Sequence, residues 1–122
     1  MEKVSQKEQL ESIKSFQSTI RKSEKALVQM TEKGASTTLV KKRLSALLIG
    51  LAVLEDVWNQ KPHAYTREEM AEARHVLSGL FPALQDMSIK TKEGSPQKTL
   101  LERRIRSLEL AVQAIDGLLV DN

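Results

Sequence analysis

In the segment TTLVKKRLSALLIGLAVLEDVW, residues 37–58, three consecutive cations precede an uncharged run of eleven residues, Leu44 to Leu54. That run is too short to span a bilayer, which needs about 20 apolar residues. Its leucines recur at helical spacing on one face, and branched apolar residues occupy a second face. A helix that is apolar on two faces packs against neighbours on two sides. The segment therefore predicts the central helix of a bundle, with Gly50 permitting a close crossing.

Three further segments show the same helical period, and no segment alternates as a strand does. The four predicted helices span residues 4–33, 38–59, 67–87 and 96–119. Four amphipathic segments joined by short loops indicate an all-α fold. We expect a single helical domain, residues 1–122, folded as an up-down-up-down antiparallel four-helix bundle. The alternative is a longer helical hairpin that completes its core by dimerising.

Local signals place several of the helix ends. Thr66 and Glu69 match the capping box, in which each side chain bonds the other's backbone N–H, so the third helix should begin at Arg67. Pro82 removes a backbone donor and should kink that helix, or end it near Phe81. The other expected boundary residues are Gly34 as a terminator, Ser36 or Thr38 as a cap, and Ser95 with Pro96 at the start of the last helix.

The composition restricts the chemistry and the compartment. The chain has no cysteine, which excludes disulfides and thiolate ligands and fits a reducing compartment. Its first ten residues, MEKVSQKEQL, are polar and do not resemble a secretory signal. We therefore expect a cytoplasmic or nuclear protein without a transmembrane segment.

The sequence offers little that is typical of a catalytic or cofactor site. His63 and His75 are the only imidazoles, and His63 lies in a polar loop that predicts a surface position. Glu72 with His75 matches half of a di-iron ligand set, which needs two such pairs, and both residues fall on the solvent face of their helix. No phosphate-binding glycine loop is present. We expect no enzyme activity, cofactor or metal, although a site made of carboxylates stays open as an alternative.

Charge is distributed unevenly although the net charge is only +3. If helices two and four start at the same end of the bundle, one end gathers the candidate partner or anion contacts Lys41, Lys42, Arg43, Lys98, Arg103, Arg104 and Arg106, with Lys33, Lys90 and Lys92 nearby. The opposite end gathers Glu55, Asp56, Glu68, Glu69, Glu72, Asp116 and Asp121.

A basic end that also contains helix N-termini can attract anions. Its candidate partners are phosphate, nucleic acid, an acidic lipid surface, an acidic protein surface or the acidic end of another copy. The other interpretation is that these are ordinary solvated charges. The basic segments contain no interleaved aromatic residues, which argues against recognition of single-stranded nucleic acid.

The stretch TTLVKKRLSAL, residues 37–47, resembles a recurring segment in the Gag-like region of BEL/Pao-type retrotransposon polyproteins. The similar positions are Thr38, Leu39, Val40, Arg43, Leu44 and Leu47, and YTREEM opens a further helix in a similar place, so the resemblance covers about residues 6–87. The tryptophan expected one turn after the arginine–leucine pair is Leu51 here, and no zinc knuckle or aspartic-protease triplet is present. The resemblance implies a non-enzymatic, self-associating helical module that helps to gather RNA.

Together these patterns predict a non-enzymatic helical module that binds a partner protein or itself. The alternative is an anion-directed module that binds nucleic acid or an acidic membrane surface through the basic end.

Overall fold

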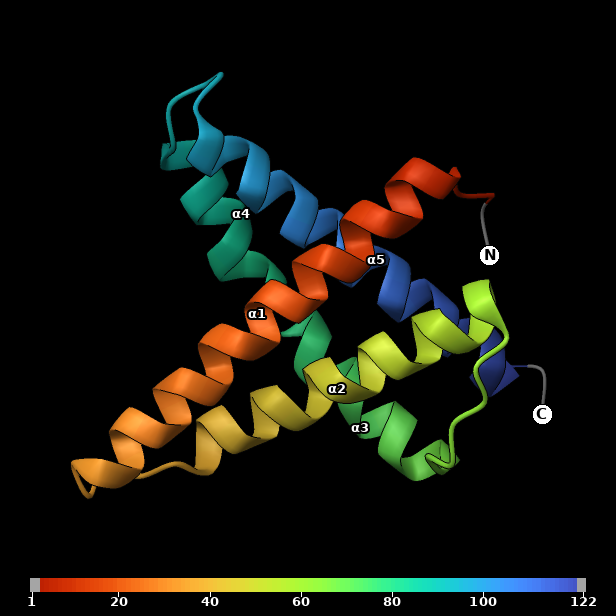
Figure 1. Ribbon diagram of the computed structural model, residues 1–122, viewed down its shortest axis with the longest axis horizontal. Helices are drawn as coiled ribbons and strands as arrows, with labels where there is room; N and C mark the ends of the chain where they lie inside the picture. The colour runs from red at the N-terminus through yellow and green to blue at the C-terminus, as the bar shows by residue number, and fades with distance from the viewer. Residues whose placement is uncertain (1–2, 121–122) are drawn as a thin grey trace.

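The computed structural model describes residues 3–120, which contain five helices and no strand. The helices are α1 (Gln6–Glu32), α2 (Thr38–Asn59), α3 (Arg67–Ser78), α4 (Phe81–Lys90) and α5 (Pro96–Val120) (Figure 1). The prediction of an all-helical fold is confirmed. None of the helices within residues 3–120 is long and apolar enough to cross a membrane.

The predicted third helix is divided in two at Gly79 and Leu80. Helix α3 ends at Ser78 and α4 begins at Phe81, with Pro82 in the first turn of α4. Proline has no N–H to donate to the carbonyl of Ser78, four residues earlier, and its ring crowds that carbonyl. The sequence prediction that the helix kinks or ends near Phe81 is therefore confirmed.

Most of the predicted helix ends agree with the structure. The Thr66 N–H donates to Glu69 Oε1 at 2.9 Å, and the Glu69 N–H donates to Thr66 Oγ1 at 3.1 Å, so the capping box is formed. Gly34 has a φ of 71°, the left-handed conformation that favours glycine after a helix. The Ser95 hydroxyl accepts from the Lys98 N–H at 3.2 Å at the start of α5.

The predicted cap of α2 is wrong. The sequence predicted Ser36 or Thr38 as the N-cap, but Thr37 occupies that position. Its side chain makes no capping hydrogen bond. The backbone of Thr37 still accepts from the Lys41 N–H at 2.9 Å, so the first helical turn is formed without a side-chain cap.

Helices α2 and α5 hold the bundle together. Helix α2 packs on α1, α3 and α5, and α5 also packs on α1, α3 and α4. Helix α4 contains no buried residue and packs chiefly on α5. The connection between α1 and α2 and the connection between α4 and α5 point to separate corners of the molecule, whereas both chain ends lie on the far side (Figure 1).

Helices α1, α2 and α3 approach one another closely at Gly50. Phe16 of α1 and Leu77 of α3 are at most 1% exposed. Both side chains lie over Gly50 of α2, where a Cβ would come within 3.0 Å of the Phe16 ring and 3.1 Å of the Leu77 side chain. The close crossing predicted from Gly50 is confirmed, because a larger residue there would force these side chains apart.

Helix α5 is buried on more than one face. Leu108, Ala111 and Ile115 are buried on one stripe, and Leu110 and Ala114 are buried on a second apolar face. These additional residues explain how α5 can contact four other helices.

Helix α3 is also tied to α5 at the surface. The Arg74 Nη2 donates to Asp116 at 3.3 Å, and the Nε of Arg74 donates to the same carboxylate. The hydrogen bond and the charge of Asp116 raise the pKa of Arg74 above its ordinary value. Both side chains are 44% exposed, so this ion pair fixes orientation more than it adds stability.

Candidate functional site: a basic groove between α1 and the α4–α5 hairpin

The structure distributes the seven predicted contact residues over several surroundings. Lys41, Lys42 and Arg43 are exposed in the first turns of α2. The other four lie on the first part of α5, which begins at a separate corner on the same side of the molecule, away from the chain ends (Figure 1). The two groups therefore do not form one continuous basic surface, because the two helical hairpins diverge.

Two of the predicted contact residues hold the fold together. Lys98 is 13% exposed, donates from Nζ to the backbone oxygen of Ser88 and lies 3.4 Å from Glu93. Arg106 donates from Nε to Glu8 of α1. These cations join α5 to α4 and to α1, and their charges are already partly neutralised.

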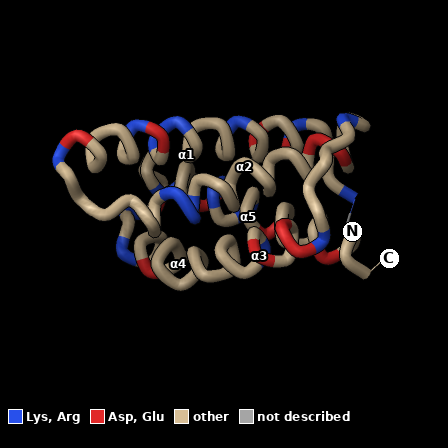
Figure 2. The backbone as a smooth tube through the Cα atoms, turned by 90° about the horizontal axis from the view of Figure 1, so that it is seen from below, with Lys and Arg blue, Asp and Glu red and all other residues tan. Residues whose placement is uncertain are grey.

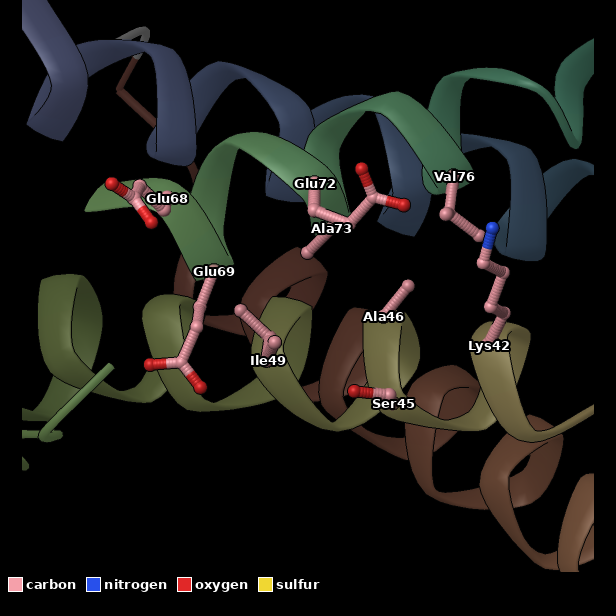
Figure 3. A pocket seen from close by; sticks show the side chains of 9 residues that line it. All are labelled: Lys42, Ser45, Ala46, Ile49, Glu68, Glu69, Glu72, Ala73 and Val76. Atoms are coloured by element: carbon pink, nitrogen blue, oxygen red, sulfur yellow. The ribbon is translucent and has the colours of Figure 1, made fainter. Parts of the chain in front are cut away.

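Lys42 lies at one end of a shallow groove between α2 and α3, whose volume is about 310 Å³. Small and apolar side chains form its floor, and three glutamates of α3 approach its other part (Figure 3). The lining residues are Lys42, Ser45, Ala46, Ile49, Glu68, Glu69, Glu72, Ala73 and Val76. Because Glu68 and Glu69 lie in the first turn of α3, they complement the positive end of its helix dipole.

The predicted acidic end is only partly assembled. Acidic positions gather around the start of α3 (Figure 2). Glu55 is paired with Lys61 at 3.0 Å, and Asp56 lies 3.6 Å from His63. Asp121 lies outside the described residues.

A larger groove separates α1 from the α4–α5 hairpin. We call it the basic groove, and its volume is about 790 Å³. Helix α1 forms one wall, and the end of α4 with the start of α5 forms the other. The lining residues are Glu11, Lys14, Ser15, Gln17, Ser18, Arg21, Lys22, Met87, Thr91, Gln97, Leu100, Leu101, Arg103 and Arg104.

Positive charge dominates the basic groove. Lys14, Arg21 and Lys22 reach it from α1, since residues seven and eight positions apart lie on the same helical face. Arg103 and Arg104 reach it from α5. Among the described residues that line the groove, Glu11 is the one acid, and it lies 3.1 Å from Arg103. The other four cations therefore face the groove without a lining carboxylate beside them: Lys14, Arg21, Lys22 and Arg104.

The wall formed by α4 and α5 also presents apolar surface. Met87 is 50% exposed and Leu100 is 58% exposed, and the buried Leu101 lines the same wall. A surface that combines exposed apolar side chains with like charges suits a ligand that is itself amphipathic and of opposite charge.

Arg104 differs from its neighbours on α5. Its Nε is buried and has no hydrogen-bond partner among the described residues. Its side chain is partly exposed where it lines the basic groove. A buried guanidinium N–H without an acceptor is unusual, because protein interiors satisfy nearly all such donors.

In a second groove, between α1 and α5, carboxylates neutralise the arginines. It has a volume of about 400 Å³ and shares Glu11 and Arg103 with the basic groove. Its two arginines, Arg103 and Arg106, are paired with Glu11 and Glu8, and Lys7 and Glu102 add one charge of each sign. Because carboxylates of α1 already occupy these arginines, this groove offers little unneutralised charge to a ligand.

Of the basic groove, sequence reasoning found Arg103 and Arg104 but missed Lys14, Arg21 and Lys22. The signal was present, since these three residues and Ser18 follow one helical stripe on the polar side of α1. The stripe alone did not predict a binding groove, because the sequence does not show that this face of α1 lies opposite α5.

Neither histidine is among the described residues that line these three grooves. Glu72 and His75 are exposed on α3, as predicted. The prediction that His63 is a surface residue is wrong, because its side chain is 11% exposed and its Nδ1 accepts from the Tyr65 N–H at 3.2 Å. Within residues 3–120 no group of three or more histidine, cysteine, aspartate or glutamate side chains is placed to hold a metal ion.

Comparisons with known proteins return no relative from which a function could be transferred. No protein-family model matches the chain, and no curated protein and no solved structure matches it. The resemblance to the Gag-like region therefore stays a prediction, and the function has to be argued from the grooves themselves.

Proposed function

We propose that this chain is a non-enzymatic helical interaction module whose basic groove binds an acidic, amphipathic segment of a protein partner. The proposal treats the helices as an up-down-up-down antiparallel bundle whose two hairpins diverge, so that α1 and the α4–α5 hairpin form the walls of the groove. Self-association through this groove, in the cytoplasm or nucleus, belongs to the same proposal.

The observation that supports a protein partner most strongly is the pairing of cations with exposed apolar side chains in one groove. Lys14, Arg21 and Lys22 line one wall, while Met87 and Leu100 line the other. A helical peptide with acids on one face and leucines on the adjacent face satisfies both walls at once. The charged wall sets the association rate and specificity, and the apolar wall contributes the burial that holds the complex together.

An acidic membrane surface could also take up the exposed apolar side chains, but these line a groove between two helical walls, which fits a single helix better than a flat bilayer. Binding of nucleic acid is supported by the cations alone. No aromatic side chain is among the described residues that line the basic groove, so base stacking has no platform there. The exposed Met87 and Leu100 would also remain without a role against a phosphate backbone. These features favour the protein partner, and the test below includes both alternatives.

The proposal is tested with a synthetic amphipathic helix of about 18 residues that carries glutamates beside a leucine stripe, which we call the glutamate peptide. A second peptide replaces every glutamate by glutamine. Binding of both is measured by fluorescence anisotropy, and heparin, a single-stranded RNA oligonucleotide and anionic phospholipid vesicles are measured in parallel.

We expect the glutamate peptide to bind and the glutamine peptide to bind about tenfold more weakly or not at all, because several exposed ion pairs are lost. Raising the salt from about 50 mM to about 500 mM should weaken the glutamate peptide by a similar factor, since it screens these pairs. Equal affinity for the two peptides would contradict the proposal. Tighter binding of RNA, heparin or vesicles than of the glutamate peptide would favour the anion-directed alternative.

A further inference from the structure

Arg104 contributes to the wall of the basic groove a buried N–H donor that is unpaired among the described residues. Two other arginines on the same helix, Arg103 and Arg106, have carboxylate partners from α1. The Nε of Arg104 has no acceptor although it is buried. Removing a charged donor from water without giving it an acceptor destabilises the folded chain.

The surroundings of Arg104 show that the residue is fixed in place. Its backbone oxygen accepts from the Ser107 hydroxyl at 2.8 Å, and Ser107 is 1% exposed. Leu101 and Leu108, one turn before and one turn after, are both buried. The side chain therefore starts from a buried turn of α5 and lines the groove. Because the Nε itself is buried, a ligand in the groove would pair with the outer nitrogens of the guanidinium and offset its charge.

We infer that Arg104 is the specificity-determining residue of the basic groove, and that it takes a carboxylate side chain of the partner. This inference rests on the function proposed above. A guanidinium presents a planar fork of N–H groups that donates to both oxygens of a carboxylate, which the single ammonium of a lysine does not reproduce. Lys14, Arg21 and Lys22 are exposed and attract the partner's charge, whereas Arg104 selects the group that binds beside it.

The inference predicts opposite effects on stability and on binding when Arg104 is replaced by methionine. Methionine keeps the unbranched shape but removes the unsatisfied donor, so the melting temperature of the free chain should stay the same or rise. The affinity for the glutamate peptide should fall by about tenfold to a hundredfold, the range expected for a charged hydrogen bond. A residue with a purely structural role would lose stability and keep its affinity.

Two further variants complete the test. Arg104→Lys keeps the charge but not the fork, and it should lose about fivefold or more in affinity for the glutamate peptide. Arg43→Met makes the same chemical change as Arg104→Met on α2, outside the basic groove, and should bind as the original chain does. Melting by circular dichroism and peptide binding are measured for each variant.

Each result bears on the inference separately from the proposed function. If the original chain binds the glutamate peptide but Arg104→Met binds equally well, the inference is wrong and the proposed function stands. Retention of full affinity by Arg104→Lys would likewise overturn the inference, because charge alone would then suffice. Failure of the original chain to bind the glutamate peptide would overturn the proposed function, and the inference with it.

Discussion

Replacing Lys14, Arg21 and Lys22 together by glutamate is expected to weaken binding of the glutamate peptide by on the order of a hundredfold. Each substitution removes an attraction and adds a repulsion, and each of these terms is worth about 0.2–1 kcal/mol at an exposed site. All three side chains are exposed on α1, so the helix and its buried face should remain intact. The affinity is measured by fluorescence anisotropy, and circular dichroism confirms that the variant is folded.

The matched control replaces Lys41, Lys42 and Arg43 by glutamate. Both triple variants change the net charge by the same amount, but the control residues lie at the start of α2 and none of them lines the basic groove. Since salt screens charges beyond about 10 Å, the control should stay within about threefold of the original affinity. Equal losses in both variants would mean that binding follows total charge, and the assignment of the groove would then be wrong.

Replacing Phe16 by alanine is expected to lower the free energy of unfolding by about 3–5 kcal/mol, the cost of removing a buried phenylalanine and leaving a cavity. Phe16 is 1% exposed and lies over Gly50 at the crossing of α1 and α2. Leu10→Ala, on the same helix, should cost less than about 0.5 kcal/mol, because Leu10 is 56% exposed. Urea denaturation of each variant measures these values.

A double variant distinguishes a cavity at this crossing from general damage to α1. In the original chain a Cβ on Gly50 meets the Phe16 ring at 3.0 Å, so Gly50→Ala should bring little or no net gain. With Phe16 replaced by alanine the ring contact disappears and only the Leu77 side chain at 3.1 Å remains, so Gly50→Ala should become more favourable than in the original chain by up to about 1 kcal/mol, the helix propensity of alanine over glycine. If Gly50→Ala had the same effect with and without Phe16, the described packing of α1 on α2 would be incorrect.

The sequence predicted the helices well because their signals are local. Three of these signals act within a few residues, so the neighbouring residues in the sequence suffice to interpret them. They are the capping box of Thr66 and Glu69, the left-handed Gly34 and the proline at position 82. Gly50 was informative for a different reason, since a glycine inside an apolar helix indicates a close neighbour. The missed cap at Thr37 shows how weak such a signal becomes when several hydroxyl residues adjoin.

The basic groove could not be predicted in the same way. Its shape depends on how far the α4–α5 hairpin diverges from α1, which follows from tertiary packing and from the break at Gly79 and Leu80. Spacing along one helix shows that Lys14, Arg21 and Lys22 share a face, but not which helix that face meets. The predicted basic end assumed four complete helices stacked side by side in an antiparallel bundle, so it grouped Lys42 with Arg104 although they line different grooves.

Chemical-shift mapping by NMR locates the binding surface most directly. The chain is labelled with ¹⁵N and titrated with the glutamate peptide at low salt. We predict that the largest amide shifts fall on residues 11–22 of α1, on the end of α4 near Met87 and on residues 97–104 of α5, the segments that line the basic groove. Shifts concentrated on the groove between α2 and α3, or spread evenly over all the helices, would contradict the proposed function.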